Sequence, residues 1–294
     1  MDDILLELAT QDPLDDRAFR ILLSDDEQFV ALAEAFTAEN LDTDSIVDIN
    51  GELVLTVKGK LIRLDTLRDT DIAYINMEGQ IDAALFPYKR HLFYGSVIYA
   101  MGIQKSETYQ NLKPVISIVV YKKKGTADLI ENACMAGNLI KTKDDKKQLV
   151  LIAVNTEKWQ EAESEELRAY LSTLHYGIMT EENKDKFCDL DVESAVFKKF
   201  QRAVKLACAR TKHQEYKDKG DEFMAVKYTR IISDEEQLAA EEKGMEKGME
   251  KGKQLGLEIA REIFQMLKAD VPVPEIAQKY QVSLREVEEY RVLL

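Results

Sequence analysis

The stretch KLIRLDTLRDTDIAYINMEGQ, residues 60–80, predicts two short apolar strands joined by a polar turn. Asp65 lies in the first strand, and Glu78 and Gln80 lie near the end of the second. Because successive side chains of a strand point to opposite faces, Glu78 and Gln80 share one face. A carboxylate on one strand and an acid-x-amide on its neighbour can converge on Mg²⁺. This ion prefers oxygen ligands, usually one or two carboxylates with waters and substrate phosphate.

The register of this strand pair decides whether the two acids meet. A hairpin centred on Thr70 would pair Asp65 with Ile75 and leave Glu78 on the opposite face. A change of register by one residue would place both acids on one face, because the side-chain period is two. Both registers are compatible with the sequence, and a lone Asp beside a Glu-x-Gln also occurs on ordinary solvated sheets.

Hydrophobic periodicity outlines the rest of the chain. Helices are expected over residues 15–39 (with a break at 24–26), 88–102, 163–174 and 192–210, and strands over 46–49, 53–57, 61–67, 72–80, 114–121 and 149–154. Asn50-Gly51 predicts a tight hairpin between the first two strands. In the helix over 88–102, Phe93, Val97 and Ile98, with Met101, form the expected buried stripe. Arg90 and Tyr94 are four residues apart on one face.

The net charge of −14 is concentrated at the N-terminus, where residues 1–48 contain fourteen acids and only two basic residues. The remainder is close to neutral, so the acidic balance does not exclude DNA as a partner. No run is long enough to cross a bilayer, and the acidic N-terminus is unlike a signal peptide. Three widely spaced cysteines indicate free thiols, and we expect a cytoplasmic protein without a membrane partner.

The most basic part of the chain is residues 194–230, with ten Lys or Arg against four Asp or Glu. Four of these cations lie off the apolar stripe of the expected helix, namely Lys198, Lys199, Arg202 and Lys205. They form either an ordinary solvated helix surface or a flank that faces DNA phosphates.

Glycines recur every four residues near the C-terminus, at Gly244, Gly248, Gly252 and Gly256. On a helix they form one stripe that would suit close approach of a second helix in a homo-oligomer. A charged, frayed linker is the alternative. The tail predicts a helix-turn-helix-like unit with a Ser283–Glu286 capping box. Its acidic second helix favours packing or partner binding over DNA reading. The expected division is 1–232, 233–268 and 269–294.

Set on this order of elements, Asp65…Glu78-x-Gln80 resembles the PD-(D/E)xK nuclease superfamily. More narrowly, the chain resembles the recombination-promoting nuclease and transposase family. The similar segments cover most of residues 15–121: DDRAFRILL (15–23), GKLIRLD (59–65), INMEGQ (75–80), KRHLFYGSVIY (89–99) and YQNLKPVISIVV (109–120). The similarity is loose from 125 to 230. The resemblance implies an α/β (α+β) restriction-endonuclease-like core, a mixed sheet flanked by helices, with a helical C-terminal extension.

The resemblance also implies a Mg²⁺- or Mn²⁺-dependent endodeoxyribonuclease linked to recombination or mobile elements. Asp65 and Glu78 would hold the metal, and Gln80 would complete the catalytic set in place of the usual lysine. Arg90 would meet phosphate, together with the four cations of residues 194–230. Glutamine carries no charge and can only orient a ligand by hydrogen bonding. The resembled family often has glutamine at this position, so the departure is tolerated, and weak activity would be unsurprising. The alternative is a weakly active or inactive nuclease-fold protein that acts as an oligomeric interaction module.

Overall fold

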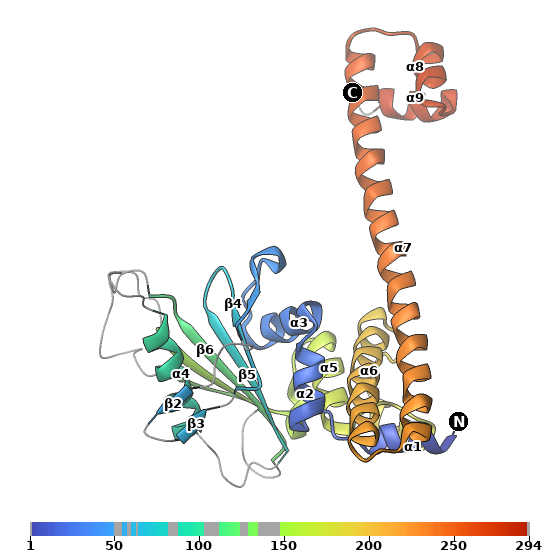
Figure 1. The fold of residues 1–294 in the computed structure, drawn as a ribbon. Helices are drawn as coiled ribbons and strands as arrows, with labels where there is room; N and C mark the ends of the chain where they lie inside the picture. Colours follow the sequence, from blue (N-terminus) through green and yellow to red (C-terminus); the bar gives the residue numbers. More distant parts are fainter. Residues whose placement is uncertain are drawn as a thin grey trace. The chain divides into compact units, whose positions relative to one another are not determined.

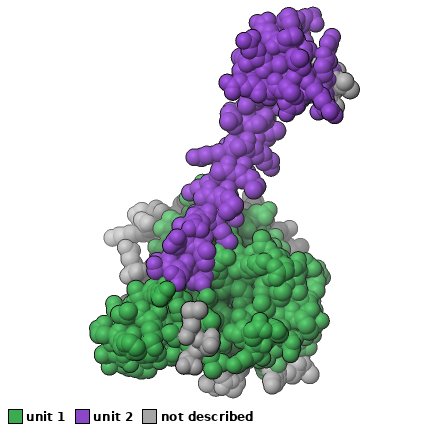
Figure 2. Space-filling view, turned by 90° about the vertical axis from the view of Figure 1, so that its right-hand side faces the viewer, with its two compact units in different colours: residues 1–232 green, residues 233–294 purple. Residues whose placement is uncertain are grey.

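The computed structural model describes residues 2–49, 55–57, 60–62, 64–81, 88–102, 112–123, 129–134 and 148–292. The chain divides into two compact units, Met1–Ile232 and Ser233–Leu294 (Figure 2). In the described part of the chain, no helix combines the length and the apolar character needed to span a bilayer.

The first unit is built on a mixed sheet whose described strands follow the order β1-β4-β5-β6-β8-β7 (Figure 1). Strands β5, β6 and β8 run parallel, and the other pairings are antiparallel. The strands are β1 (Val47–Asp48), β4 (Thr66–Asp69), β5 (Tyr74–Gln80), β6 (Val115–Tyr121), β7 (Ile130–Cys134) and β8 (Leu149–Asn155). The near-continuous apolar runs of β6 and β8 reflect burial on both faces. The predicted mixed sheet flanked by helices is confirmed.

Helices cover both faces of this sheet (Figure 1). Helix α4 lies on one face, whereas α2 and α3 lie on the other, with α5 and α6 packed outside them. The bounds are α1 (Asp2–Thr10), α2 (Asp16–Leu23), α3 (Asp26–Thr37), α4 (Tyr88–Met101), α5 (Glu165–Tyr176) and α6 (Ala195–Asp218), with 3₁₀ turns η1 (Thr43–Ser45), η5 (Thr156–Glu161) and η6 (Lys184–Phe187). The larger core lies between the sheet and the helices on the same face as α2, and it contains Phe19, Phe29, Ile75 and Met77.

The predicted hairpin turn at Asn50-Gly51 falls on residues outside the described part of the chain, and the described strand residues on either side of it pair with other segments. Strand β1 pairs with β4, and β2 (Leu55–Val57) pairs with β3 (Lys60–Ile62) in a separate ribbon. A buried charge accounts for the choice. Arg68 on β4 is almost fully buried and forms an ion pair with Asp48, which lies opposite it on β1. A buried guanidinium needs such a partner.

The buried face of α4 is also rotated from the predicted one. Ile98 is buried as expected, but Phe93 and Met101 are 39% and 43% exposed. His91 and Tyr94 take the inward positions instead. Burial lowers the pKa of His91 to about 4, so the ring is neutral at physiological pH. The rotation turns Arg90 and Tyr94 toward the end of β5.

The second unit is helical. It contains the larger part of α7 (Glu222–Lys268), then α8 (Val273–Tyr280) and α9 (Leu284–Val292). The end of α7 packs with α8 and α9 around Ile263, Leu267, Ile276 and Val287. The predicted capping box is confirmed: the Ser283 backbone N–H donates to Glu286 at 2.7 Å, and the Glu286 backbone N–H donates to the Ser283 hydroxyl at 3.2 Å.

Candidate functional site

The observed register places Asp65 opposite Glu78. Strand β4 pairs with β5 so that Thr66 lies opposite Met77, and continuing this register by one residue sets Asp65 opposite Glu78. The turn explains this register. Thr70 and Ala73 exchange backbone and side-chain hydrogen bonds of 2.8–3.1 Å, so the turn spans Thr70–Ala73 and is not centred on Thr70. The Thr70-centred register is therefore not formed, and both acids belong to one site.

Asp65 lies at a bend immediately before β4, not within a strand as predicted. Its Oδ2 atom accepts a hydrogen bond of 3.2 Å from the backbone N–H of Gly79. Burial raises the pKa of Asp65 well above its usual range, and the charge of Glu78 and a hydrogen bond with Asp16 raise it further. The bond from Gly79 opposes these effects only in part.

Glu78 is the most deeply buried acid of the site, with only 1% of its side chain exposed. Neither carboxylate oxygen makes a hydrogen bond of good geometry. Burial raises the pKa of Glu78, while Arg90, the Asn76 side chain and the Asp65 backbone N–H lie close enough to oppose that rise. Two buried carboxyl groups with raised pKa values therefore face each other.

Arg90 on α4 is the cation nearest to this pair among the contacts of the described residues. Its Nη2 atom lies 3.7 Å from Oε2 of Glu78, and its Nε–H donates to the Tyr94 hydroxyl at 2.9 Å. Burial alone would lower the pKa of Arg90, but the Tyr94 hydrogen bond and the Glu78 charge raise it above its ordinary value. The Arg90 side chain is 44% exposed, so it can also reach a ligand from solvent.

Gln80 is the last residue of β5, where it pairs with Tyr121 of β6. It is half-buried and points to the same face of the strand as Glu78. The structure thus brings Asp65, Glu78, Gln80 and Arg90 to one end of the central strands.

Gly79 and Asp16 are site residues that the sequence did not identify as functional. A Cβ atom on Gly79 would lie 2.9 Å from the Phe19 ring and 3.1 Å from the Leu14 carbonyl oxygen, so the glycine allows α2 to approach β5. Phe19 lies one turn after Asp16, and this close packing carries Asp16 to Asp65. The only sequence signal for Asp16 was the Asp-x-x-Phe spacing in segment 15–23.

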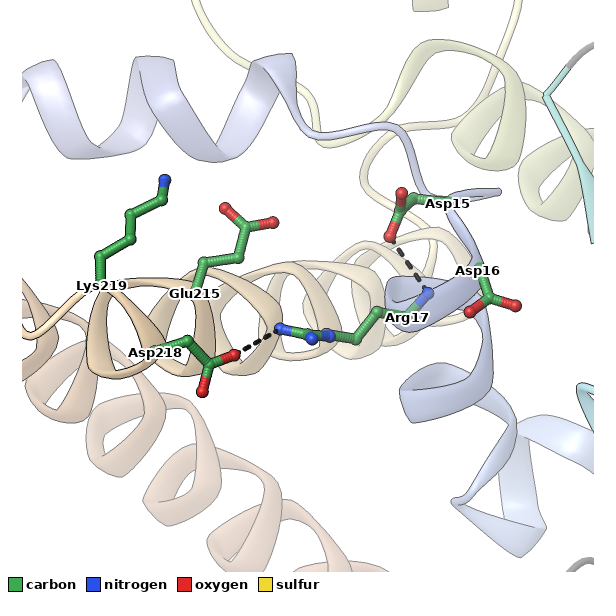
Figure 3. A pocket seen from close by; sticks show the side chains of 6 residues that line it. All are labelled: Asp15, Asp16, Arg17, Glu215, Asp218 and Lys219. Atoms are coloured by element: carbon green, nitrogen blue, oxygen red, sulfur yellow. Dashed lines mark hydrogen bonds and ion pairs between the residues drawn. The ribbon is translucent and has the colours of Figure 1, made fainter.

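Asp16 also lines an open pocket of about 440 Å³ between α2 and the end of α6 (Figure 3). Four acids and two cations line it: Asp15, Asp16, Arg17, Glu215, Asp218 and Lys219. Arg17 lies 3.5 Å from Asp218 across this pocket. The excess of carboxylates makes the pocket unsuited to an anion such as phosphate.

The four predicted phosphate contacts of residues 194–230 lie on α6, away from the acids. Helix α6 packs against α1, α2 and α5, in the layers on the opposite face of the sheet from α4 (Figure 1). Lys198 forms an ion pair of 2.6 Å with Glu193, and Lys199 pairs with Glu27. Arg202 and Lys205 are also on this helix. The structure does not bring these side chains to Glu78, and their role in DNA binding stays a prediction.

The acid pair suits a hard divalent cation. Among the described residues, no group of three or more His, Cys, Asp or Glu has metal-binding geometry. Mg²⁺ does not require one, because it commonly takes one or two carboxylates and completes its shell with waters and substrate phosphate. The buried oxygens of Glu78, which make no hydrogen bond of good geometry, and the carboxyl group of Asp65 are oxygen ligands of the kind that this ion takes.

Comparison with known proteins identifies the family. A family model described as "PD-(D/E)XK nuclease family transposase" matches residues 13–230, which include the whole sheet and every residue of the site. Comparisons with curated proteins and with solved structures gave no match. The matched region covers well over half of the chain and contains the facing acids in the arrangement described above. The chain therefore belongs to the PD-(D/E)XK nuclease family transposases, which supports a nuclease-type function in general.

Proposed function

We propose that this protein is an endodeoxyribonuclease that depends on Mg²⁺ or Mn²⁺, with Asp65 and Glu78 as the metal-holding residues. One observation carries the proposal: both oxygens of Glu78 are buried without a good hydrogen bond and face a second buried carboxyl group. Such an arrangement is costly unless a cation or a proton compensates it. A role in recombination or mobile elements accords with the family name.

The residues around the acids have separable roles. When bound, the metal would polarise the scissile phosphate and lower the pKa of an attacking water. Arg90 would bind a phosphate oxygen through its exposed N–H groups, since arginine suits phosphate geometry. Gln80 can orient a water or a phosphate only by hydrogen bonding, because its amide carries no charge. We therefore expect slower cleavage than in relatives with lysine at this position.

Nicking of supercoiled DNA by the full chain tests the proposal. The parent should nick DNA with Mg²⁺ or Mn²⁺ and not with EDTA. Asp65→Ala and Glu78→Ala should abolish this activity while folding normally. Asp71→Ala removes an exposed acid from the same turn and should cut like the parent. Acid-pair variants that cleave DNA at the parental rate would refute the assignment of Asp65 and Glu78.

A second candidate function is that of an oligomeric interaction module on an inactive nuclease fold. Two observations favour it: Gln80 replaces the charged lysine, and four glycines of α7 have no atom within 4 Å of an added Cβ. Each glycine destabilises a helix by about 0.5–1 kcal/mol relative to alanine. We propose that a second copy of α7 packs on this stripe. Folded protein that fails to cleave with either metal would favour this function.

A further inference from the structure

Tyr94 fixes the orientation of the arginine that faces the acid pair. The hydroxyl accepts the Nε–H of Arg90 at 2.9 Å, and the guanidinium carbon lies 5.1 Å from the centre of the Tyr94 ring. Tyr94 itself is buried in the smaller core under α4, with Leu67, Ile98 and Val115. Arg90 is therefore held by a rigid anchor on its own helix.

The distance between Arg90 and Glu78 shows what this anchor achieves. A charge-assisted N–H···O bond is about 2.7–2.9 Å long, and arginine commonly binds a carboxylate through two such bonds. Here the closest approach is 3.7 Å, and both Glu78 oxygens are left without a good hydrogen bond. A freely moving guanidinium beside a buried carboxylate would close this gap.

We propose that Tyr94 is a positioning residue whose hydroxyl prevents Arg90 from forming a bidentate pair with Glu78. Held in this way, Arg90 leaves the Glu78 oxygens available to a divalent cation and keeps its outer N–H groups available to a phosphate. The inference rests on the proposed metal-dependent function. It assigns the role to the hydroxyl group, whereas the Tyr94 ring accounts for the packing.

Calorimetric titration of the full-length protein with Mn²⁺, without DNA, tests this inference independently of activity. Tyr94→Phe removes only the hydroxyl and should weaken Mn²⁺ binding about tenfold, the usual scale for residues that orient a metal ligand. Tyr99→Phe is the matched control. It removes a hydroxyl from the same helix that donates to Gln148 at 3.4 Å, and it should bind Mn²⁺ like the parent.

A double-mutant cycle separates positioning from packing. In an Arg90→Gln background there is no guanidinium to restrain, so adding Tyr94→Phe should leave Mn²⁺ affinity unchanged. An equal loss in both backgrounds would show that Tyr94 acts through packing and would overturn the inference. Parental affinity in Tyr94→Phe would overturn it as well.

Two further outcomes complete the test. Arg90→Lys retains the charge but lacks the Nε–H, so it should weaken Mn²⁺ binding as Tyr94→Phe does; this variant decides the matter if Tyr94→Phe fails to fold. Parental affinity in Arg90→Lys would contradict the proposed restraint. A parent protein that binds no Mn²⁺ would refute the proposed function together with this inference. If the parent binds Mn²⁺ and the variants bind it equally well, only the inference is refuted.

Discussion

Replacing Glu78 with glutamine should stabilise the metal-free protein while removing a charge that the metal needs. The two side chains have nearly the same shape, so the change acts mainly on charge. Burial raises the pKa of Glu78 from 4.5, and burial together with the Glu78 charge raises the pKa of Asp65 from 3.8. A carboxyl group whose pKa is higher in the folded state loses folding stability as pH rises from its unfolded pKa through its folded pKa. The parent should therefore become less stable between about pH 4 and pH 8.

The magnitude follows from the unmatched oxygens of Glu78. A buried polar group without its hydrogen bond costs about 1–3 kcal/mol, and more when it is charged. The positive charge of Arg90, 3.7 Å from Glu78, offsets part of this free-energy cost. We expect Glu78→Gln to gain about 1–3 kcal/mol at pH 8, or about 2–10 °C in Tm for a unit of this size. At pH 5 the Glu78 carboxyl group of the folded parent is largely protonated, so the stability gained by Glu78→Gln should be smaller.

Thermal unfolding followed by tryptophan fluorescence measures this effect in the first unit alone. The chain has a single tryptophan, Trp159, which is buried in the main core of that unit. In EDTA at pH 8 the variant should melt above the parent. Excess Mg²⁺ should raise the Tm of the parent and not that of the variant, because only the parent retains both carboxylates.

Glu181→Gln is the control for loss of an acid, since the Glu181 side chain is 88% exposed, and its Tm should match that of the parent. The reasoning is refuted if Glu78→Gln is no more stable than the parent in EDTA at pH 8. It is also refuted if the difference is the same at pH 5, because the gain would then not come from ionisation.

Three other changes test separate parts of the structure. Gly79→Ala forces a Cβ against the Phe19 ring and should cost about 1–3 kcal/mol of unfolding free energy, measured by urea denaturation; an unchanged midpoint would show that α2 does not need this approach. Truncation after Asp234 removes the glycine stripe and should reduce the mass found by light scattering, whereas an unchanged mass would contradict self-association through α7. Reversal of the α6 cations to glutamate should weaken DNA binding and flatten its salt dependence, while deletion of residues 269–294 should leave both unchanged; the opposite result would assign DNA binding to the tail. The reversal set is Lys198, Lys199, Arg202 and Lys205.

The sequence by itself determined the type and order of most elements. The apolar runs at 114–121 and 149–154 predicted central strands covered on both faces, which are β6 and β8, and the helices over 88–102 and 163–174 lie within a few residues of α4 and α5. These predictions succeed because hydrophobic period and length are properties of neighbouring residues. The Ser283–Glu286 capping box could be identified for a similar reason, because it depends on residues only three positions apart.

The sequence also identified the acids of the candidate site, but it did not determine whether Asp65 and Glu78 lie on the same face. The alternation of β5 placed Glu78 and Gln80 on one face, whereas the pairing of Asp65 depended on a turn whose extent the sequence left open. In the structure, the Thr70–Ala73 hydrogen bonds settle that extent and bring Asp65 opposite Glu78.

Only the tertiary structure decided which distant segments complete the site and the sheet. Asp16 lies beside Asp65 because Gly79, which has no side chain, leaves room for the Phe19 ring. Strand β1 pairs with β4 because the buried Arg68 forms an ion pair with Asp48. Helix α4 places Arg90 near Glu78. Each of these outcomes depends on a buried charge or a close contact between segments far apart in the chain. Hydrophobic periodicity reports which face of an element is apolar, but burial of a charged group is decided by the partner that meets it.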